Sequence, residues 1–178
     1  MAMLEAILSP EWEDRVYSFD AHWGPGQQMA SMRSGSGDEY SIVFSLAGAY
    51  IRGFDHKSPM SPYGLDPARP WPGVIDDDPP EFAAQVTEPA FAHSFPDGPV
   101  PALTACLWRR TTDDRWRTGT IDFPDGSVDA DGAKWMFELL VEGTPEACCR
   151  HAGDYFEVPV AAELVQHVYP TDPRLSPR

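Results

Sequence analysis

The first part of the chain carries apolar side chains at every second position, in segments separated by tight turns. The clearest segment is 39–46, whose apolar face holds Tyr40, Ile42, Phe44 and Leu46. Because strand side chains alternate between the two faces of a sheet, this spacing predicts a half-buried β-strand. The same spacing predicts strands over 15–23, 28–34 and 49–54, with Tyr17, Phe19, Ala21 and Trp23 sharing one face. Strands this close in sequence pair as an antiparallel meander.

Helical patterns follow later in the chain. A hairpin is expected over 103–123, turning at 111–114, and helices are expected over 131–142, after Thr144, and over 160–168. A further helix before Pro89 is expected to be capped by Asp78, with Pro79 at its first position. Strands first and helices last favour the α+β class. We therefore predict an antiparallel sheet of five or six strands with C-terminal helices packed on one face.

The length of 178 residues suits one globular domain that spans 1–178. A long proline-rich loop is predicted over 55–80, and long loops in compact domains are often functional. The tail 170–178 is expected to fray.

The formal net charge of −15 disfavours binding to nucleic acid and to anionic membranes, because both carry negative charge. It favours basic proteins or small cations as partners, and it also serves solubility. No apolar run approaches the roughly 20 residues of a membrane span, and the acidic residues near the start lead us to expect no secretory signal. The cysteines Cys106, Cys148 and Cys149 do not form a disulfide framework. We expect reduced thiols and a cytoplasmic location.

Two short segments each pair a carboxylate with an imidazole. Asp20 and His22 share one face of a predicted strand, and Asp55 and His56 follow another strand at the mouth of the long loop. If these strands are neighbours, the four side chains converge, and they would bind a divalent metal or supply a general acid and base. The alternative is that both histidines are simply solvated on the polar face of the sheet.

The segment Ser127–Glu138 resembles the calcium loop of the EF-hand at several positions. Asp129, Asp131 and Glu138 match ligand positions, and Gly132 matches the turn. Ser127 departs from the aspartate at the first position, and a strand precedes the loop where that family has a helix. The alternative is a turn in which Asp131 or a neighbour caps the following helix.

The long loop also offers a candidate binding surface. Its aromatic and acidic residues are Tyr63, Trp71, Asp76 and Asp77. Exposed aromatic rings surrounded by carboxylates suit a basic protein surface. No nucleotide-binding glycine loop, hydrolase elbow or zinc-protease motif occurs in the sequence.

The stretches RGFDHKSPMSP and GTPEACCRHAGDYFEVPVAAELVQHVY resemble a group of uncharacterised bacterial single-domain proteins. That resemblance implies no activity. In general character, a small acidic α+β domain rich in aromatics is similar to immunity proteins that neutralise toxins. The first hypothesis is therefore a non-enzymatic intracellular protein-binding domain without a cofactor. The alternative is a metal-dependent enzyme or small-molecule binder built on the paired Asp and His residues.

Overall fold

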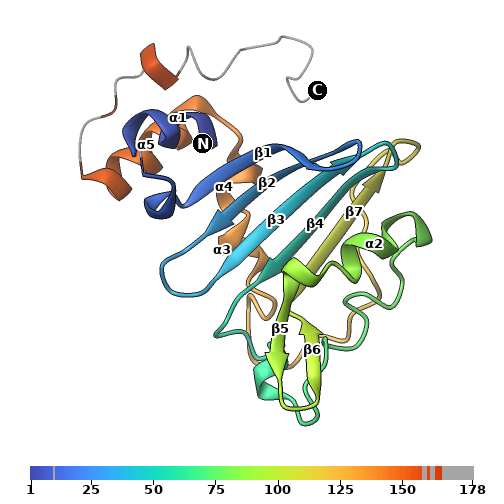
Figure 1. Cartoon of the computed structure of the whole chain (residues 1–178). Coiled ribbons are helices and arrows are strands. Elements are labelled where there is room, and N and C mark those ends of the chain that lie inside the picture. Colours follow the sequence, from blue (N-terminus) through green and yellow to red (C-terminus); the bar gives the residue numbers. More distant parts are fainter. Residues whose placement is uncertain (10, 158–159, 161–162, 166–178) are drawn as a thin grey trace.

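The predicted meander is the centre of the computed structural model, which describes residues 1–9, 11–157, 160 and 163–165 (Figure 1). The meander strands pair antiparallel with their neighbours, and β7 joins beside β4 to give the order β1-β2-β3-β4-β7. These strands are β1 (Tyr17–Gly24), β2 (Gln27–Arg33), β3 (Glu39–Ser45), β4 (Gly48–Phe54) and β7 (Ala105–Arg110). The prediction of an α+β fold with an antiparallel sheet is confirmed.

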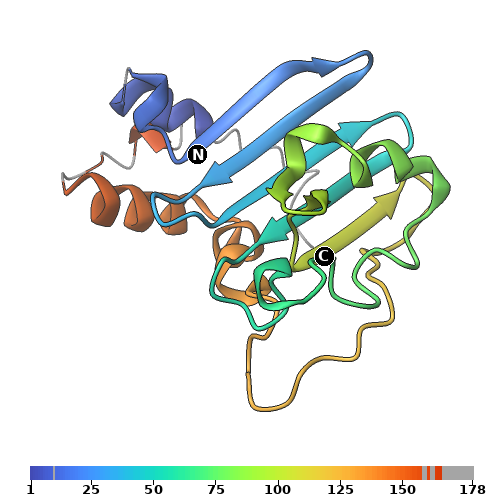
Figure 2. The ribbon, with the colours of Figure 1, turned by 60° about the horizontal axis from the view of Figure 1, so that its bottom comes forward.

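The predicted strand over 115–123 does not form. Only one bridge, Trp108 to Arg117, continues the sheet, and the chain then runs as an irregular connection to residue 132 (Figure 2). The connection instead packs on the long loop, where the amide of Thr120 donates to Asp77 over 2.8 Å. A second difference is a small sheet of β5 (Ala92–Phe95) and β6 (Gly98–Pro101), over a segment with prolines for which no strand was predicted. Proline is tolerated there because a two-stranded sheet has only edge strands.

Helices occur at the start of the chain, in its middle and in its last third. They are α1 (Ala2–Leu8), α2 (Ala83–Val86), α3 (Ala133–Met136), α4 (Glu138–Glu142) and α5 (Pro145–Phe156). Thr144 caps α5 as predicted, by accepting from the amide of Ala147. The predicted last helix, 160–168, falls largely outside the described residues, of which 163–165 are helical, and the tail 170–178 lies wholly outside them. Within the described residues, no helix is long and apolar enough to cross a membrane.

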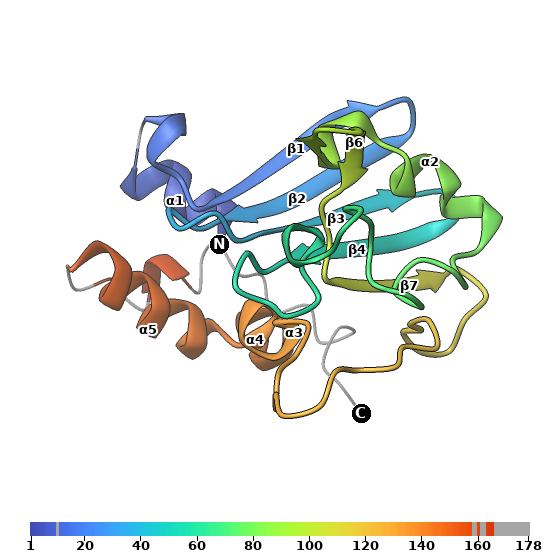
Figure 3. The same cartoon turned by 90° about the horizontal axis from the view of Figure 1, so that it is seen from below.

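Different elements pack on the two faces of the sheet (Figure 3). Helices α3 and α4 pack on one face, where Met136 and Phe137 contact a cluster that includes Tyr40, Ile42 and Ile51. The opposite face, with Tyr50, Cys106 and Trp108, is buried under Met60, Val74, Phe82 and Leu103. The predicted long loop is therefore a packed layer of the core, and the expected C-terminal helices cover only the other face.

The side chain of Arg52 ties this loop layer to the sheet. It is 1% exposed, and its guanidinium forms an ion pair with Glu39. It also donates to the carbonyl oxygen of Phe91 over 3.2 Å and lies 4.5 Å from the centre of the Phe91 ring. Because a buried cation requires such partners, Arg52 fixes the position of Phe91, which directly precedes the β5–β6 hairpin.

We predict that Arg52→Met lowers the free energy of unfolding by about 3 kcal/mol, because it leaves Glu39 with only the more distant Arg33, 3.9 Å away, as a cationic neighbour. Urea denaturation measures this loss. The double variant Arg52→Met/Glu39→Gln should recover part of it, because no uncompensated charge remains. Equal stability of the wild type and the single variant would contradict this role of Arg52.

Candidate functional site

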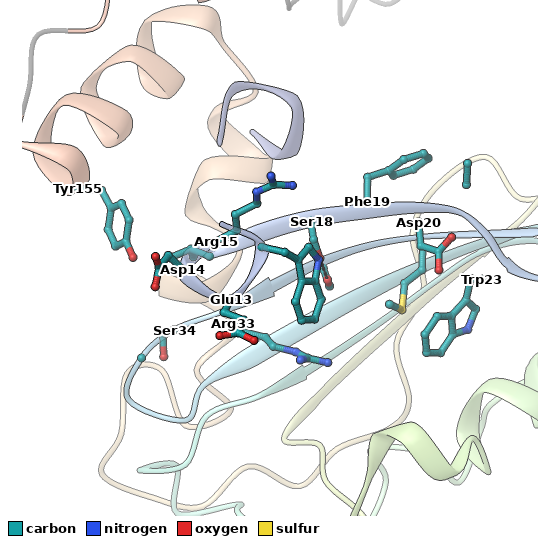
Figure 4. Close-up of a pocket in the computed structure, with 16 residues that line it drawn as sticks. Glu13, Asp14, Arg15, Ser18, Phe19, Asp20, Trp23, Arg33, Ser34 and Tyr155 are labelled. Atoms are coloured by element: carbon teal, nitrogen blue, oxygen red, sulfur yellow. Dashed lines mark hydrogen bonds between the residues drawn. The ribbon is translucent and has the colours of Figure 1, made fainter. Parts of the chain in front are cut away.

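A groove of about 710 Å³ runs along β1 at the edge of the sheet (Figure 4). Its walls come from the 3₁₀ turn Trp12–Asp14, from β1 and β2, and from Tyr155 of α5. We call it the acidic groove, because Glu13, Asp14 and Asp20 line it and all three are exposed. Trp12, which is 62% exposed, also lines it.

An irregularity in β1 completes the groove. The pairing of β1 with β2 shifts between Asp20 and Gly24, and the carboxylate of Asp20 accepts from the amide of His22 over 2.7 Å. Between these two residues β1 advances by four positions while β2 advances by two, which interrupts the alternation of side chains within the stretch. Trp23 therefore stacks on Phe91, with ring centres 5.8 Å apart, and does not share a face with Phe19 as the alternation predicted. Figure 4 shows Phe19 pointing away from Asp20 and Trp23.

The cations in the acidic groove have partners of their own. Arg15 donates to the carbonyl oxygen of Ser9 over 2.9 Å, and Arg33 lies 3.9 Å from Glu39. For Glu13, Asp14 and Asp20, by contrast, no ion pair with a described residue is found. The acidic groove therefore presents carboxylates and indole rings to solvent.

The structure does not bring the two Asp–His pairs together. Asp20 and His22 lie on β1, whereas Asp55 and His56 follow β4, and β2 and β3 separate them. Convergence required β1 and β4 to be neighbours, and the meander places them apart in the sheet. Asp38 is the actual neighbour of Asp55 and His56, and one ligand atom from each of these three lies within 4.8 Å of the others. The predicted tight turn between β3 and β4 contained this signal, because it pairs Glu39 with Phe54 and so sets Asp38 beside Asp55.

Asp38 holds His56 tightly. Its Oδ1 atom lies 2.5 Å from His56 Nδ1 and accepts the His56 amide over 3.0 Å, while Ser34 donates to Oδ2 over 3.1 Å. Burial by itself would raise the pKa of Asp38, but these hydrogen bonds hold that pKa below its ordinary value. Since Asp38 engages Nδ1, the other ring nitrogen of His56 is the one left for acid–base or ligand chemistry.

Asp55 is fixed from two sides. It accepts from the indole of Trp135 over 3.0 Å and from the amide of Lys57 over 2.8 Å. Gly132 approaches so closely that a Cβ atom there would lie 2.5 Å from Asp55 Oδ2, and its φ of +74° is left-handed. The invariant turn position of the calcium-loop resemblance thus has a packing role in this chain.

The carboxylates of the calcium-like segment cap a helix. Asp129 accepts from the amides of Lys134 and Trp135, and Asp131 accepts from the amide of Ala133. Glu138 lines a different hollow, beside Arg150 and His151. The structure therefore agrees with the capping alternative, and it does not gather Asp129, Asp131 and Glu138 around one point.

Most side chains of the predicted loop surface form hydrogen bonds with other groups of the same chain. Asp76 accepts from Gly73 over 2.7 Å, Asp77 accepts from Thr120, and the indole of Trp71 donates to Asp122 over 3.0 Å. Tyr63 is 61% exposed, and its hydroxyl lies 3.1 Å from His93 Nδ1. These four residues serve mainly to order the loop.

Asp78 does not cap the helix that begins after it. Its carboxylate instead accepts from the hydroxyl of Tyr50 over 2.8 Å and lies 3.5 Å from the thiol of Cys106. Pro79, which has no side-chain donor or acceptor, precedes the 3₁₀ turn Pro80–Phe82. The carboxylate was drawn inward because the buried Tyr50 hydroxyl needs an acceptor.

The cysteines are free thiols, as expected, and Cys106 and Cys148 are buried. Burial raises the pKa of both thiols, which keeps them protonated and unreactive.

No known protein family, curated protein or solved structure matches this chain.

We predict that Asp38→Asn lowers the free energy of unfolding at pH 7 by about 1.5–3 kcal/mol, because hydrogen bonds to a charged carboxylate are lost. The folded-state pKa of Asp38 is below its ordinary value, so its contribution is present above that ordinary value and lost as pH falls through the folded pKa. The gap between variant and wild type should narrow in acid. Thermal melting across the acid range measures it, with the exposed Asp97→Asn as control; a constant gap would contradict the assignment.

Proposed function

We propose that this chain is a non-enzymatic protein-binding domain whose acidic groove receives a basic segment of a partner protein. One observation carries the proposal: the groove along β1 combines an exposed indole with the exposed carboxylates of Glu13, Asp14 and Asp20, which form no ion pair with a described residue. Carboxylates attract lysine and arginine, and an aromatic face binds the same cations through its quadrupole.

The overall charge supports the same partner class. A net charge of −15 speeds encounter with a basic protein and disfavours acidic ones. The proposal keeps the partner expected from the sequence but moves the binding surface. It now lies at Glu13, Asp14 and Asp20, which line one groove together with Trp12, rather than at the acids of the long loop.

Immunity proteins, which neutralise toxins, are one class of binder with this character. The likeness is one of composition and fold class, and it supports the proposal only at that level. An acidic groove of this kind would suit a toxin with a basic binding surface.

We predict that Glu13→Gln/Asp14→Asn weakens binding of a labelled lysine- and arginine-rich peptide about fivefold to tenfold, because two exposed groove charges are lost. The matched control is Asp97→Asn/Asp125→Asn, which removes the same charge from exposed positions elsewhere on the chain. Fluorescence anisotropy at low and at physiological ionic strength measures both variants.

The control pair should change binding less than twofold, roughly the effect of long-range charge alone. Equal weakening by both pairs would show that net charge, and not the groove, attracts the peptide. Failure of the wild type to bind basic peptides at low ionic strength would contradict the proposed function itself.

The second candidate function is divalent-metal binding at Asp38, Asp55 and His56, favoured by the closeness of their ligand atoms. Imidazole and carboxylate ligands suit Zn²⁺. If zinc binds, it should raise the Tm of the wild type by mass action and leave His56→Gln unchanged. An unchanged wild-type Tm in excess zinc would exclude this candidate.

A further inference from the structure

The free edge of the sheet has a defined hydrogen-bonding pattern. The amide of Arg33 donates to the carbonyl oxygen of Val16 over 2.8 Å, and the register then pairs Ser18 with Ser31 and Asp20 with Met29. In an antiparallel pair, hydrogen-bonded positions alternate along the strand. Val16, Ser18 and Asp20 therefore direct their backbone groups toward β2. Tyr17 and Phe19 direct theirs outward, away from the sheet.

The first outward amide is already satisfied. Glu5 of α1, which is 0% exposed, accepts the amide of Tyr17 over 2.8 Å. The next outward residue is Phe19, and among the described residues no strand lies beside β1 on this side. Its side chain is 52% exposed. Helix α1 thus closes the start of the edge, and the bulge after Asp20 ends it, which leaves a short open stretch centred on Phe19.

A different groove flanks each face of this stretch. The acidic groove lies on the face of Asp20 and Trp23. A second groove, of about 600 Å³, lies on the helix face between the sheet and helices α1 and α4. We call it the apolar groove, because most of its lining is apolar, including Met1, Met3, Phe19, Ile42 and Leu140. The exposed side chains of Met3 and Leu140 mark it as an apolar patch that the described residues leave uncovered.

We propose that an extended segment of the partner adds to the sheet as an antiparallel strand at Phe19, with alternating basic and apolar side chains. Successive side chains of a strand point to opposite faces, so basic residues enter the acidic groove and apolar residues enter the apolar groove. This inference rests on the proposed function, and it adds the conformation and the sequence pattern of the bound segment.

The strand register also determines which backbone amides of the bound partner segment point toward β1. Residues directly opposite in an antiparallel pair share a face, and at Phe19 the backbone groups point toward the added strand. The partner residue opposite Phe19 must therefore be apolar, and its amide must donate to Phe19. The amides of the basic residues point away, toward solvent.

The test uses labelled peptides of alternating lysine and valine, together with an isomer in which all lysines precede all valines. Anisotropy should show about tenfold stronger binding of the alternating peptide, since only it fills both grooves. N-methylation of the valine amides should weaken binding about tenfold or more, because those amides face β1, whereas N-methylation of the lysine amides should leave it unchanged.

Variants of the protein at Phe19 test the same backbone contact. Phe19→Pro removes both the ring and the outward amide, whereas Phe19→Ala removes the ring but keeps the amide. Edge strands tolerate proline, and circular dichroism shows whether each variant folds. The proline variant should lose binding beyond the loss in Phe19→Ala. If it does not fold, the N-methylated peptides still decide the question.

Distinct outcomes separate the two proposals. If both isomers bind equally and valine N-methylation has no effect, while Glu13→Gln/Asp14→Asn still weakens binding, the groove function stands and strand addition is wrong. If neither peptide binds, strand addition is also wrong. If the protein alone is a dimer that Phe19→Pro converts to a monomer, a second copy occupies the edge, which overturns the inference.

Discussion

The antiparallel pairing of β3 with β4 decides what every other element can reach. With Ile42 opposite Ile51, both side chains point to the helix face, and the adjacent pair Val43 and Tyr50 points to the loop face. A slip of one residue would exchange the two sets and expose the core. The same register sets Asp38 beside Asp55. The core layers on both faces of the sheet, the buried Arg52 and the Asp38–His56 pair all depend on this register.

Much of the sheet could be predicted because its signal is local. Alternation over a few residues, followed by a turn, is sufficient to define β2, β3 and β4 and their order. The β5–β6 hairpin was missed because prolines argue against strands, and only the isolation of a two-stranded sheet makes them acceptable. The segment 115–123 alternates in the same way as a strand, but the long loop competes for its backbone, as the bond from Thr120 to Asp77 shows.

The candidate sites were less predictable, because they depend on contacts between distant segments. Asp55 and His56 were singled out from sequence, but their partner Asp38 becomes visible only once strand register is known. The acidic side chains of the long loop were predicted to form a binding surface. They accept hydrogen bonds from backbone amides, such as that of Gly73, and every residue except proline has such an amide. The residue types therefore did not indicate these bonds. The acidic groove was missed because an irregularity in β1 interrupts the alternation before Trp23, and such irregularities have no simple residue signature here.

The buried carboxylate of Glu5 couples the N-terminal helix to the acidity of the surroundings. Burial raises the pKa of Glu5, so the docked helix favours the protonated form and water favours the ionised one. At neutral pH, detachment of α1 is therefore less costly than in mild acid. Each detachment would uncover the amide of Tyr17 and lengthen the open margin of β1 by one repeat of the ladder. The length of β1 whose backbone is open to an added strand thus depends on pH.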